Sequence, residues 1–422
     1  MKDHVFQVAG VLRFMLLLTM TIPAGSFAQP KPPTLVTINA DQVLEINGVK
    51  VFPIGFTMPP PFDGLTPEGK SGLQELADAG GTFMRTGTSG GDWTPATVER
   101  EQQWMDAAAA HGMYCWPFLR ELGSIGTNDT RHEALLREVI NRFKNHPGLL
   151  AWKGVDEPEW GKHPLPPLLR ARDIIRELDP HHPLVVIQAP RGTVQSLRPY
   201  NAAADIIGTD IYPVGYPPGT HSLLTNKNLS LVGDYTRTMM EVAEGKMPVW
   251  MVLQIAWSGV IKPGKTLRFP TFPEERFMTY EAIINGARGL NYFGGNLAAS
   301  LTPRDAALGW NWTFWSRVLK PVIEEIGRKS PLHPALIASD SRLPIKVSGE
   351  GMEWCIRESN RAIFILACKR EGATTQAAFA GLPATAEVGE VMFESPRRVQ
   401  AKDGRFTDWF APFEVHVYRF PL

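Results

Sequence analysis

Eight short apolar segments recur along the chain, with polar loops and amphipathic helical patterns between them. They cover residues 51–56, 82–87, 113–119, 149–157, 183–189, 205–212, 248–257 and 289–295. Continuously apolar strands are typical of parallel sheets that helices cover on both faces. The alternation suits either a closed (β/α)8 barrel or an open doubly wound sheet. Eight regular units, without G-x-G-x-x-G after the first segment, favour the TIM barrel.

The helices between these segments have ordinary start and stop signals. We expect them over residues 66–80, 94–111, 131–146, 165–178, 273–287 and 312–328. Thr94 followed by Pro95 is a typical helix start, and Pro147 is a typical stop. The sequence therefore predicts an α/β protein in which helices surround the barrel strands.

The two ends of the chain depart from this pattern. Alternating apolar residues around Asn47-Gly48 predict a hairpin, so residues 29–47 are interpreted as a leader and capping hairpin. The barrel is assigned to residues 48–330. Residues 335–422 contain short alternating runs separated by turn signals, which predict a small all-β sandwich domain.

Residues 1–28 have the pattern of a secretory signal peptide. Lys2 and Arg13 flank a short apolar stretch, and Ser26-Phe27-Ala28 has the small-x-small form of a cleavage site. The apolar run is short for a membrane span. We therefore expect a secreted or periplasmic protein without stable membrane insertion after cleavage.

Composition narrows the classes of partner and cofactor. Lys+Arg and Asp+Glu are both 43, so no basic excess suggests nucleic acid. Neither C-x-x-C nor H-E-x-x-H occurs, and the ten His are scattered, so we expect neither metal nor cofactor. Cys355 and Cys368 flank a predicted hairpin, and whether they pair is left open.

Polar residues at the ends of the predicted strands are the first candidates for chemistry, because barrel active sites lie at that face. In AWKGVDEPEW a buried strand runs directly into Asp156 and Glu157. Neighbouring residues of a regular strand point to opposite sides, so only one of the two should face the lumen. One is the candidate acid/base, and the other is a supporting group. An acidic helix cap is the alternative interpretation.

AWKGVDEP resembles the strand 4 motif of the clan A retaining glycoside hydrolases, in which a barrel strand ends in Asn-Glu-Pro. The resemblance implies that Glu157 is the general acid/base and that Asp156 replaces the Asn. Arg85 is similar to the clan's strand 2 arginine, and Tyr212 lies where a strand 6 side chain often contacts the nucleophile. The ending FTDWFAPFEVHVYRF resembles the β-sandwich modules that follow such barrels.

The seventh predicted strand departs from the clan pattern. The clan's nucleophile is a Glu that ends this strand, whereas PVWMVLQIAW offers Gln254. An amide cannot form the covalent glycosyl intermediate. The second carboxylate could instead be Asp210, Glu121 or Asp92, the substrate could assist its own hydrolysis, or the chain could be a sugar-binding pseudoenzyme.

Several further residues are expected to bind the substrate. Aromatic faces suit the C–H faces of sugar rings, and five Trp residues follow four of the predicted strands. The candidate binding residues are Arg85, Asp92, Trp93, Asp156, Trp160, Tyr212, Gln254, Trp257, Tyr292 and Asn296, with Trp310 and Trp312 nearby in sequence.

Gly87-Thr88-Ser89-Gly90-Gly91 matches the G-x-S-x-G nucleophile elbow, so a serine hydrolase using Ser89 is a competing hypothesis. That elbow requires a direct turn from strand to helix, and further residues intervene here before the helix start at Thr94. The favoured hypothesis is an exported glycoside hydrolase that uses Glu157 and acts on a poly- or oligosaccharide. A silent carbohydrate-binding protein is the main alternative.

Overall fold

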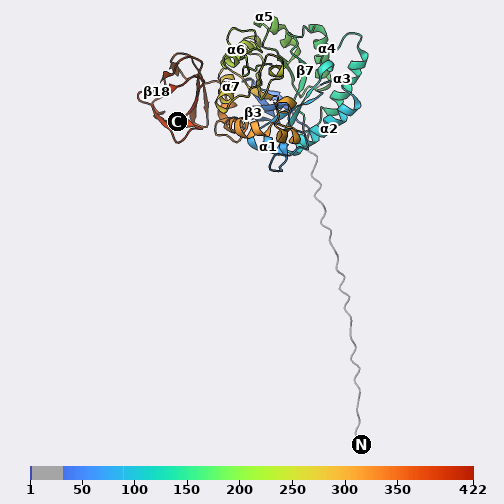
Figure 1. Cartoon of the computed structure of the whole chain (residues 1–422), viewed down its shortest axis with the longest axis horizontal. Helices are drawn as coiled ribbons and strands as arrows, with labels where there is room; N and C mark the ends of the chain where they lie inside the picture. The colour runs from blue at the N-terminus through green and yellow to red at the C-terminus, as the bar shows by residue number, and fades with distance from the viewer. Residues whose placement is uncertain (2–31, 89) are drawn as a thin grey trace. The chain divides into compact units, whose positions relative to one another are not determined.

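Eight parallel strands close into a barrel in the computed structural model, which describes residue 1, residues 32–88 and residues 90–422 (Figure 1). Residues 2–28 of the predicted signal peptide, residues 1–28, and Ser89 lie outside the described residues. The barrel strands are β4 (Ile54–Thr57), β5 (Phe83–Gly87), β6 (Tyr114–Phe118), β7 (Trp152–Asp156), β8 (Leu184–Gln188), β9 (Ile206–Asp210), β10 (Val249–Gln254) and β11 (Gly289–Phe293). The predicted barrel is confirmed, and β11 closes it by pairing with β4.

The barrel strands are apolar because both of their faces are covered. Every residue of β8, β9 and β10 is buried. Inside the barrel, the rings of Phe83, Trp116 and Trp250 pack with their centroids 5.4–6.0 Å apart. This aromatic layer fills the lumen, so open space is left only towards the strand ends.

A small antiparallel sheet precedes the barrel and consists of β1 (Val36–Ile38), β2 (Leu44–Ile46) and β3 (Val49–Val51). The β2–β3 hairpin turns at Asn47-Gly48, where both residues have positive φ, as an NG turn requires. Its apolar residues join the core that contains the lumen side chains. The predicted strand over 51–56 is corrected: Val51 ends the hairpin, and the barrel strand begins at Ile54 after Pro53.

Helices follow the barrel strands and surround them (Figure 1). Their bounds are α1 (Gly72–Ala79), α2 (Pro95–Ala110), α3 (Thr130–Phe143), α4 (Leu165–Leu178), α5 (Val194–Leu197), α6 (Leu231–Ala243), α7 (Phe272–Ile284), α8 (Pro303–Leu308), α9 (Trp312–Phe314), α10 (Lys320–Ile326) and α11 (His333–Leu336). Two predictions were wrong. The first helix starts only at Gly72, because Ser71 caps it. The helix expected over 312–328 is interrupted by a π-helical turn, Trp315–Leu319.

Two antiparallel sheets follow the helices. One contains β12 (Lys346–Ser348), β15 (Thr375–Ala380) and β18 (Arg405–Phe410). The other contains β13 (Met352–Ser359), β14 (Ala362–Lys369), β19 (Val415–Pro421), β16 (Val388–Met392) and β17 (Arg398–Gln400). Cys355 and Cys368 are free thiols, since Cys355 lies opposite Leu366 and Cys368 lies opposite Glu353.

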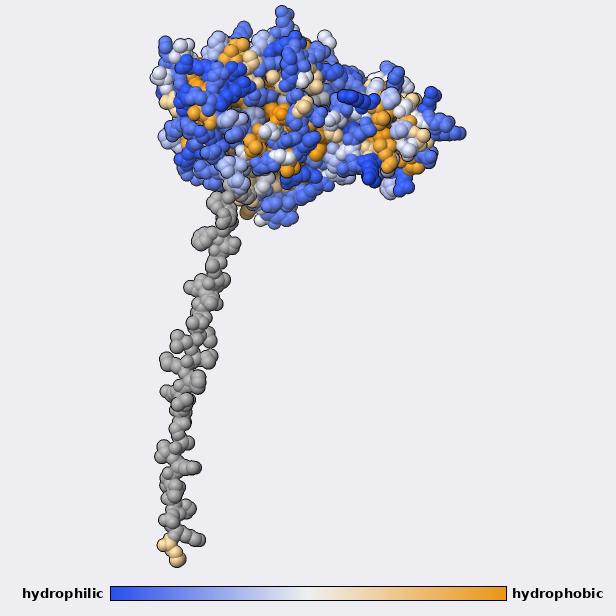
Figure 2. Space-filling view, turned by 180° about the vertical axis from the view of Figure 1, so that it is seen from behind, coloured by the Kyte–Doolittle hydropathy of each residue, from blue (hydrophilic) through white to orange (hydrophobic). Residues whose placement is uncertain are grey.

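Hydrophilic residues cover most of the face drawn in Figure 2, with hydrophobic residues in smaller patches between them. Large exposed hydrophobic side chains include Trp160 near the strand ends and Trp409 on β18. Among the described residues, no helix combines the length and the apolar character needed to cross a membrane.

Candidate active site

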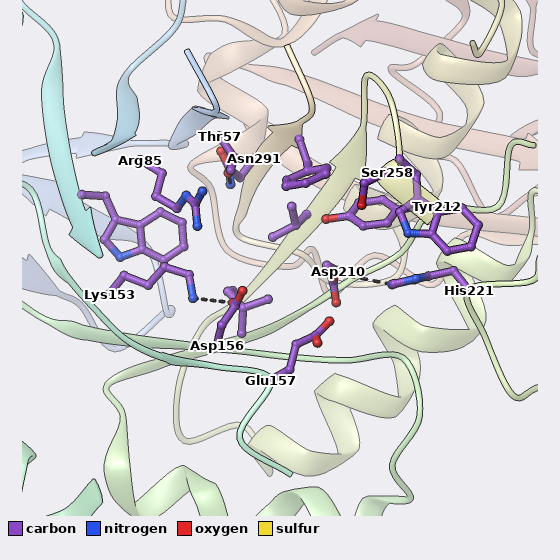
Figure 3. A pocket seen from close by; sticks show the side chains of 15 residues that line it. Thr57, Arg85, Lys153, Asp156, Glu157, Asp210, Tyr212, His221, Ser258 and Asn291 are labelled. Carbon is purple, nitrogen blue, oxygen red and sulfur yellow. Dashed lines mark hydrogen bonds and ion pairs between the residues drawn. The ribbon is translucent and has the colours of Figure 1, made fainter. Parts of the chain in front are cut away.

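A cavity of about 270 Å³ lies at the carboxyl ends of the barrel strands (Figure 3). All eight strands, or the loops that follow them, contribute to it. Its lining consists of Thr57, Arg85, Trp116, Lys153, Asp156, Glu157, Ile187, Asp210, Tyr212, His221, Val252, Trp257, Ser258, Asn291 and Phe293. Charged side chains therefore converge where the loops of a parallel barrel diverge, which is the usual location of barrel active sites.

The end of β7 places two adjacent carboxylates in this cavity. The β7–β8 register shifts between Lys153 and Asp156, and Glu157 has a φ of 45°. Left-handed backbone is uncommon for a residue with a side chain and is frequent at functional sites. The Glu157 N–H still donates to the Ile187 carbonyl at 2.8 Å. This irregularity corrects the expectation that only one of Asp156 and Glu157 could face the lumen.

Lys153 and Asp156 form an ion pair on one side of the cavity. Lys153 Nζ donates to Asp156 Oδ1 at 2.5 Å and lies 4.3 Å from the centre of the Phe118 ring. Burial lowers the pKa of Lys153, although the charge of Asp156 opposes this. Burial alone would raise the pKa of Asp156, but Lys153 and Arg85 outweigh that effect and hold it below its usual value. Asp156 is therefore an anion at neutral pH.

Glu157 and Asp210 point towards one another on the other side of the cavity (Figure 3). Glu157, Asp210 and His221 each present an atom within 4.8 Å of the others, and His221 Nε2 lies 3.4 Å from Asp210 Oδ2. Burial, with the nearby charges of Asp210 and Asp156, raises the pKa of Glu157 to about 8. Glu157 therefore holds a proton at neutral pH, as a general acid must.

Aromatic rings form the wall beside Asp210. The Tyr212 ring lies 4.7 Å from the His221 ring and 5.3 Å from the Phe293 ring. Burial and the neighbouring carboxylates of Asp210, Asp156 and Glu157 raise the pKa of Tyr212 well above its usual value. Its hydroxyl stays protonated, so it can donate a hydrogen bond in the cavity.

Gln254, the last residue of β10, does not line the cavity. Its side chain is fully buried, accepts from the Val214 N–H at 2.8 Å and donates to the Val214 carbonyl at 2.9 Å. It therefore fixes the loop after β9, and the structure does not bring it to the expected sugar contact.

Glu121 and Asp92, the other two candidates for the second carboxylate, also lie outside the cavity. Glu121 accepts from the Trp93 N–H at 3.0 Å, and Asp92 is exposed, 4.0 Å from Arg131. Of the three candidates, Asp210 is the one that the structure brings together with Glu157.

The predicted aromatic residues divide into two groups. Trp257 lines the cavity, and Trp160 is exposed with Arg191 4.4 Å from its ring. Trp93, Trp310, Trp312 and Tyr292 are buried in the core, and the Tyr292 hydroxyl is 2.8 Å from the Thr279 hydroxyl. Asn296 is exposed outside the cavity lining. The expected sugar contacts of the four buried rings and of Asn296 are therefore corrected.

Sequence reasoning missed several cavity residues. Lys153 interrupts an apolar strand, and a charge at such a position was a usable signal. His221 lies in the long connection between β9 and α6, where no periodic pattern places a side chain. The predicted elbow at Ser89 fits poorly, since a loop separates the end of β5 at Gly87 from the start of α2 at Pro95.

The spacing of Glu157, Asp210 and His221 is one that a divalent cation could occupy. Two cationic side chains, Arg85 and Lys153, line the same cavity and oppose a further positive charge there. The arrangement therefore suits a pair of catalytic carboxyl groups better than a metal centre.

The chain is similar in structure to several known proteins. No protein-family model and no curated protein sequence matches the chain. It is similar to a glycoside hydrolase with a TM-score of 0.58 and 12% identity, covering 92% of this chain and 97% of that one. A glycoside hydrolase family 5 protein from Bacteroides vulgatus has a TM-score of 0.60, 13% identity and coverage of 91% and 93%. An Anoxybacillus α-amylase has a TM-score of 0.52, 10% identity and coverage of 91% and 99%.

Sequence identities this low show a shared fold, and they do not show a shared activity or substrate. The closed parallel barrel followed by antiparallel sheets is thus a fold that resembles those of glycoside hydrolases.

Proposed function

We propose that the chain is a glycoside hydrolase that cleaves O-glycosidic bonds, with Glu157 as general acid/base and Asp210 as its partner carboxylate. The observation that carries the proposal is the approach of these two side chains, within 4.8 Å, in the cavity at the strand ends. Two carboxyl groups in different protonation states on either side of a bond are the requirement for glycoside hydrolysis.

One ligand atom of Glu157 lies within 4.8 Å of one of Asp210. An approach this close favours a retaining pair, whose carboxyl groups are roughly 5–5.5 Å apart, over an inverting pair, which needs about 6.5–9.5 Å to admit a water. In the first step the Glu157 proton passes to the leaving oxygen, the bond from that oxygen to the anomeric carbon breaks, and Asp210 bonds to that carbon. In the second step Glu157 takes a proton from water, the water oxygen bonds to the anomeric carbon, and Asp210 is released.

A catalytically silent carbohydrate-binding protein is the second candidate function. The end of β10 favours this candidate. In the clan that the strand 4 motif resembles, the nucleophile lies at the end of the corresponding strand. The described residues that reach the cavity from there are Val252, Trp257 and Ser258, none of which is an acid.

Export is a further proposal, based on the signal-peptide pattern of residues 1–28, and mass analysis of the mature N-terminus would test it.

The test compares four proteins on a panel of polysaccharides and nitrophenyl glycosides: the native chain, Glu157→Gln, Asp210→Asn and Glu159→Gln. Glu159 is the matched control, since it is a nearby carboxylate outside the cavity lining. We expect loss of turnover by at least about 10²-fold in the first two variants and little change in the third. Proton NMR of the first product should show retained anomeric configuration. Undiminished turnover in Glu157→Gln would exclude the proposed acid, and binding of glycans without any turnover would favour the second candidate.

A further inference from the structure

Arg85, on β5, carries a cationic group without a partner. It lines the cavity, its Nε is buried without a hydrogen-bond partner, and its guanidinium forms no ion pair with any described residue. Its recorded contact is with the Phe118 ring, whose centre lies 5.2 Å from Cζ. Taking a charge out of water is unfavourable unless another group compensates it. A guanidinium that lines a cavity and pairs with no described carboxylate therefore favours an anionic ligand.

The neighbouring acids do not satisfy this charge. Asp156 is the acid whose charge acts most strongly on Arg85, but the two form no ion pair, and Asp156 is already bound to Lys153 Nζ at 2.5 Å. Asp210 lies on the opposite side, with His221. Two cations and one anion thus share the Arg85 side of the cavity, so this side has an excess of positive charge.

A second unpaired donor lies next to Arg85. Trp116 on β6 is the direct register partner of Arg85, lines the same cavity and has a buried Nε1 without a hydrogen-bond partner. On the other side, Thr57 of β4 is the register partner of Arg85 and also lines the cavity. Two adjacent strands therefore each carry an unsatisfied donor among the residues that line the cavity, and that of Trp116 is shielded by its neighbours.

We propose that Arg85 binds a carboxylate of the substrate, so that the cavity is built for a uronic acid residue of a glycan. This rests on the proposed function in taking the ligand to be a carbohydrate and Glu157 to be the acid at the bond cleaved. A guanidinium matches a planar carboxylate with two parallel hydrogen bonds. Arg85 and Glu157 line one cavity of about 270 Å³, so the acidic sugar is the one beside the bond to be cleaved.

The test measures equilibrium binding by calorimetry in a Glu157→Gln background, so that no ligand is consumed. The probes are oligomers of glucuronic and galacturonic acid, their methyl esters, and the matching neutral glucose and galactose oligomers. We expect at least one acid to bind about tenfold or more tightly than its ester and its neutral counterpart. In Arg85→Gln this preference should disappear. Arg120→Gln is the matched control, because Arg120 lies 5.8 Å from the same Phe118 ring but outside the cavity lining.

The outcomes separate this inference from the proposed function. Equal binding of acid, ester and neutral sugar, or binding of none, would overturn the inference. Hydrolysis of neutral glycans alone would leave the proposed function intact and refute the uronate assignment. Tight uronate binding without hydrolysis by the native chain would support the uronate assignment and contradict the proposed hydrolase function. If Arg85→Gln fails to fold, the comparison of acid with ester decides the question without that variant.

Discussion

Lys153 Nζ lies 2.5 Å from Asp156 Oδ1, and this ion pair spans the register shift that ends β7. The lysine is almost fully buried, whereas the Asp156 side chain is 48% exposed to the cavity. The pair holds one negative charge in place close to Glu157, and the charge of Lys153 works against the rise in the pKa of Glu157. The protonation of the proposed acid is therefore set by its neighbours as well as by its burial.

The first prediction concerns the alkaline side of the pH–rate profile. With the pKa of Glu157 at about 8, the protonated and active form of the acid is present below pH 8 and is lost as the pH rises through it. We expect kcat/KM on the best substrate of the panel to fall about tenfold per pH unit above pH 8. A profile that starts to fall near pH 5, the ordinary range of a glutamate, would contradict this assignment.

Replacing Lys153 by Met should move the alkaline limb of the pH–rate profile, the fall in kcat/KM above pH 8, to higher pH. The substitution removes a positive charge that lowers the pKa of Glu157, and it leaves the charge of Asp156 unpaired, which raises that pKa further. The measurement is the pH dependence of kcat/KM. Lys162→Met is the matched control, because Lys162 is an exposed lysine in the same β7–α4 connection. A limb that stays in place or moves to lower pH would show that Lys153 does not act on Glu157.

A chelator should leave the activity unchanged. Glu157, Asp210 and His221 are spaced so that they could hold a cation, but Arg85 and Lys153 in the same cavity disfavour one. We expect the same rate before and after dialysis against EDTA, with Mg²⁺, Ca²⁺ or Zn²⁺ added back in separate samples. Loss of activity on dialysis and recovery with one of these ions would mean that the three residues act as metal ligands.

Local patterns predicted the barrel because each strand and helix carries its own periodicity and caps. β8 and β9 are apolar apart from Gln188, Thr209 and Asp210 near their carboxyl ends, and the Thr94-Pro95 start of α2 is visible in sequence. The start of α1 was missed, since Thr66-Pro67 resembles a cap while Ser71 is the residue that accepts from the Gln74 N–H. A choice between two local caps depends on tertiary contacts that a pattern does not contain.

The site was predictable where a side chain follows a strand directly. Arg85, Asp156, Glu157, Asp210 and Tyr212 were singled out for that reason, and all of them line the cavity. Position at a strand end does not determine where the side chain points. For this reason Gln254 and Tyr292 were expected to bind substrate, although neither lines the cavity. The first binds the backbone at Val214, and the second packs in the core. His221 comes from a long connection whose course depends on the assembled barrel.

Gln254→Glu tests whether the end of β10 can supply a carboxylate. The Gln254 side chain both accepts from and donates to the Val214 backbone, so an ionised Glu would face the Val214 carbonyl without a proton to donate. We expect a loss of about 1–3 kcal/mol in the free energy of unfolding at pH 8, with a smaller loss at pH 5, where a protonated carboxyl can donate. Gln103→Glu, the same change at an exposed site on α2, is the control.

The same variant should not restore activity to Asp210→Asn, because the side chain at position 254 stays bound to Val214 and outside the cavity lining. Turnover by Gln254→Glu combined with Asp210→Asn would show instead that β10 can present a nucleophile, as in the clan that the strand 4 motif resembles.

The last prediction concerns stability and a carboxyl group below the site. Glu101 of α2 is buried, accepts from the Thr86 hydroxyl at 2.6 Å and accepts from the Gly87 N–H at 2.7 Å, so it ties α2 to the end of β5. Burial raises its pKa to about 7, although both hydrogen bonds oppose the rise. Between pH 4.5, the ordinary pKa of a glutamate, and pH 7, the folded chain therefore holds a proton that the unfolded chain has lost. Its contribution to stability falls as the pH rises through that window, by about 3 kcal/mol in total.

Glu101→Gln should remove this part of the pH dependence, because an amide does not titrate. The measurement is the free energy of unfolding in urea at pH 5 and pH 8, for the native chain, for Glu101→Gln and for Glu99→Gln. Glu99 is an exposed carboxylate on the same helix, so its variant should keep the native difference between the two pH values. If the native chain and Glu101→Gln lose equal stability between pH 5 and pH 8, Glu101 is ionised throughout that range and its burial does not set its charge.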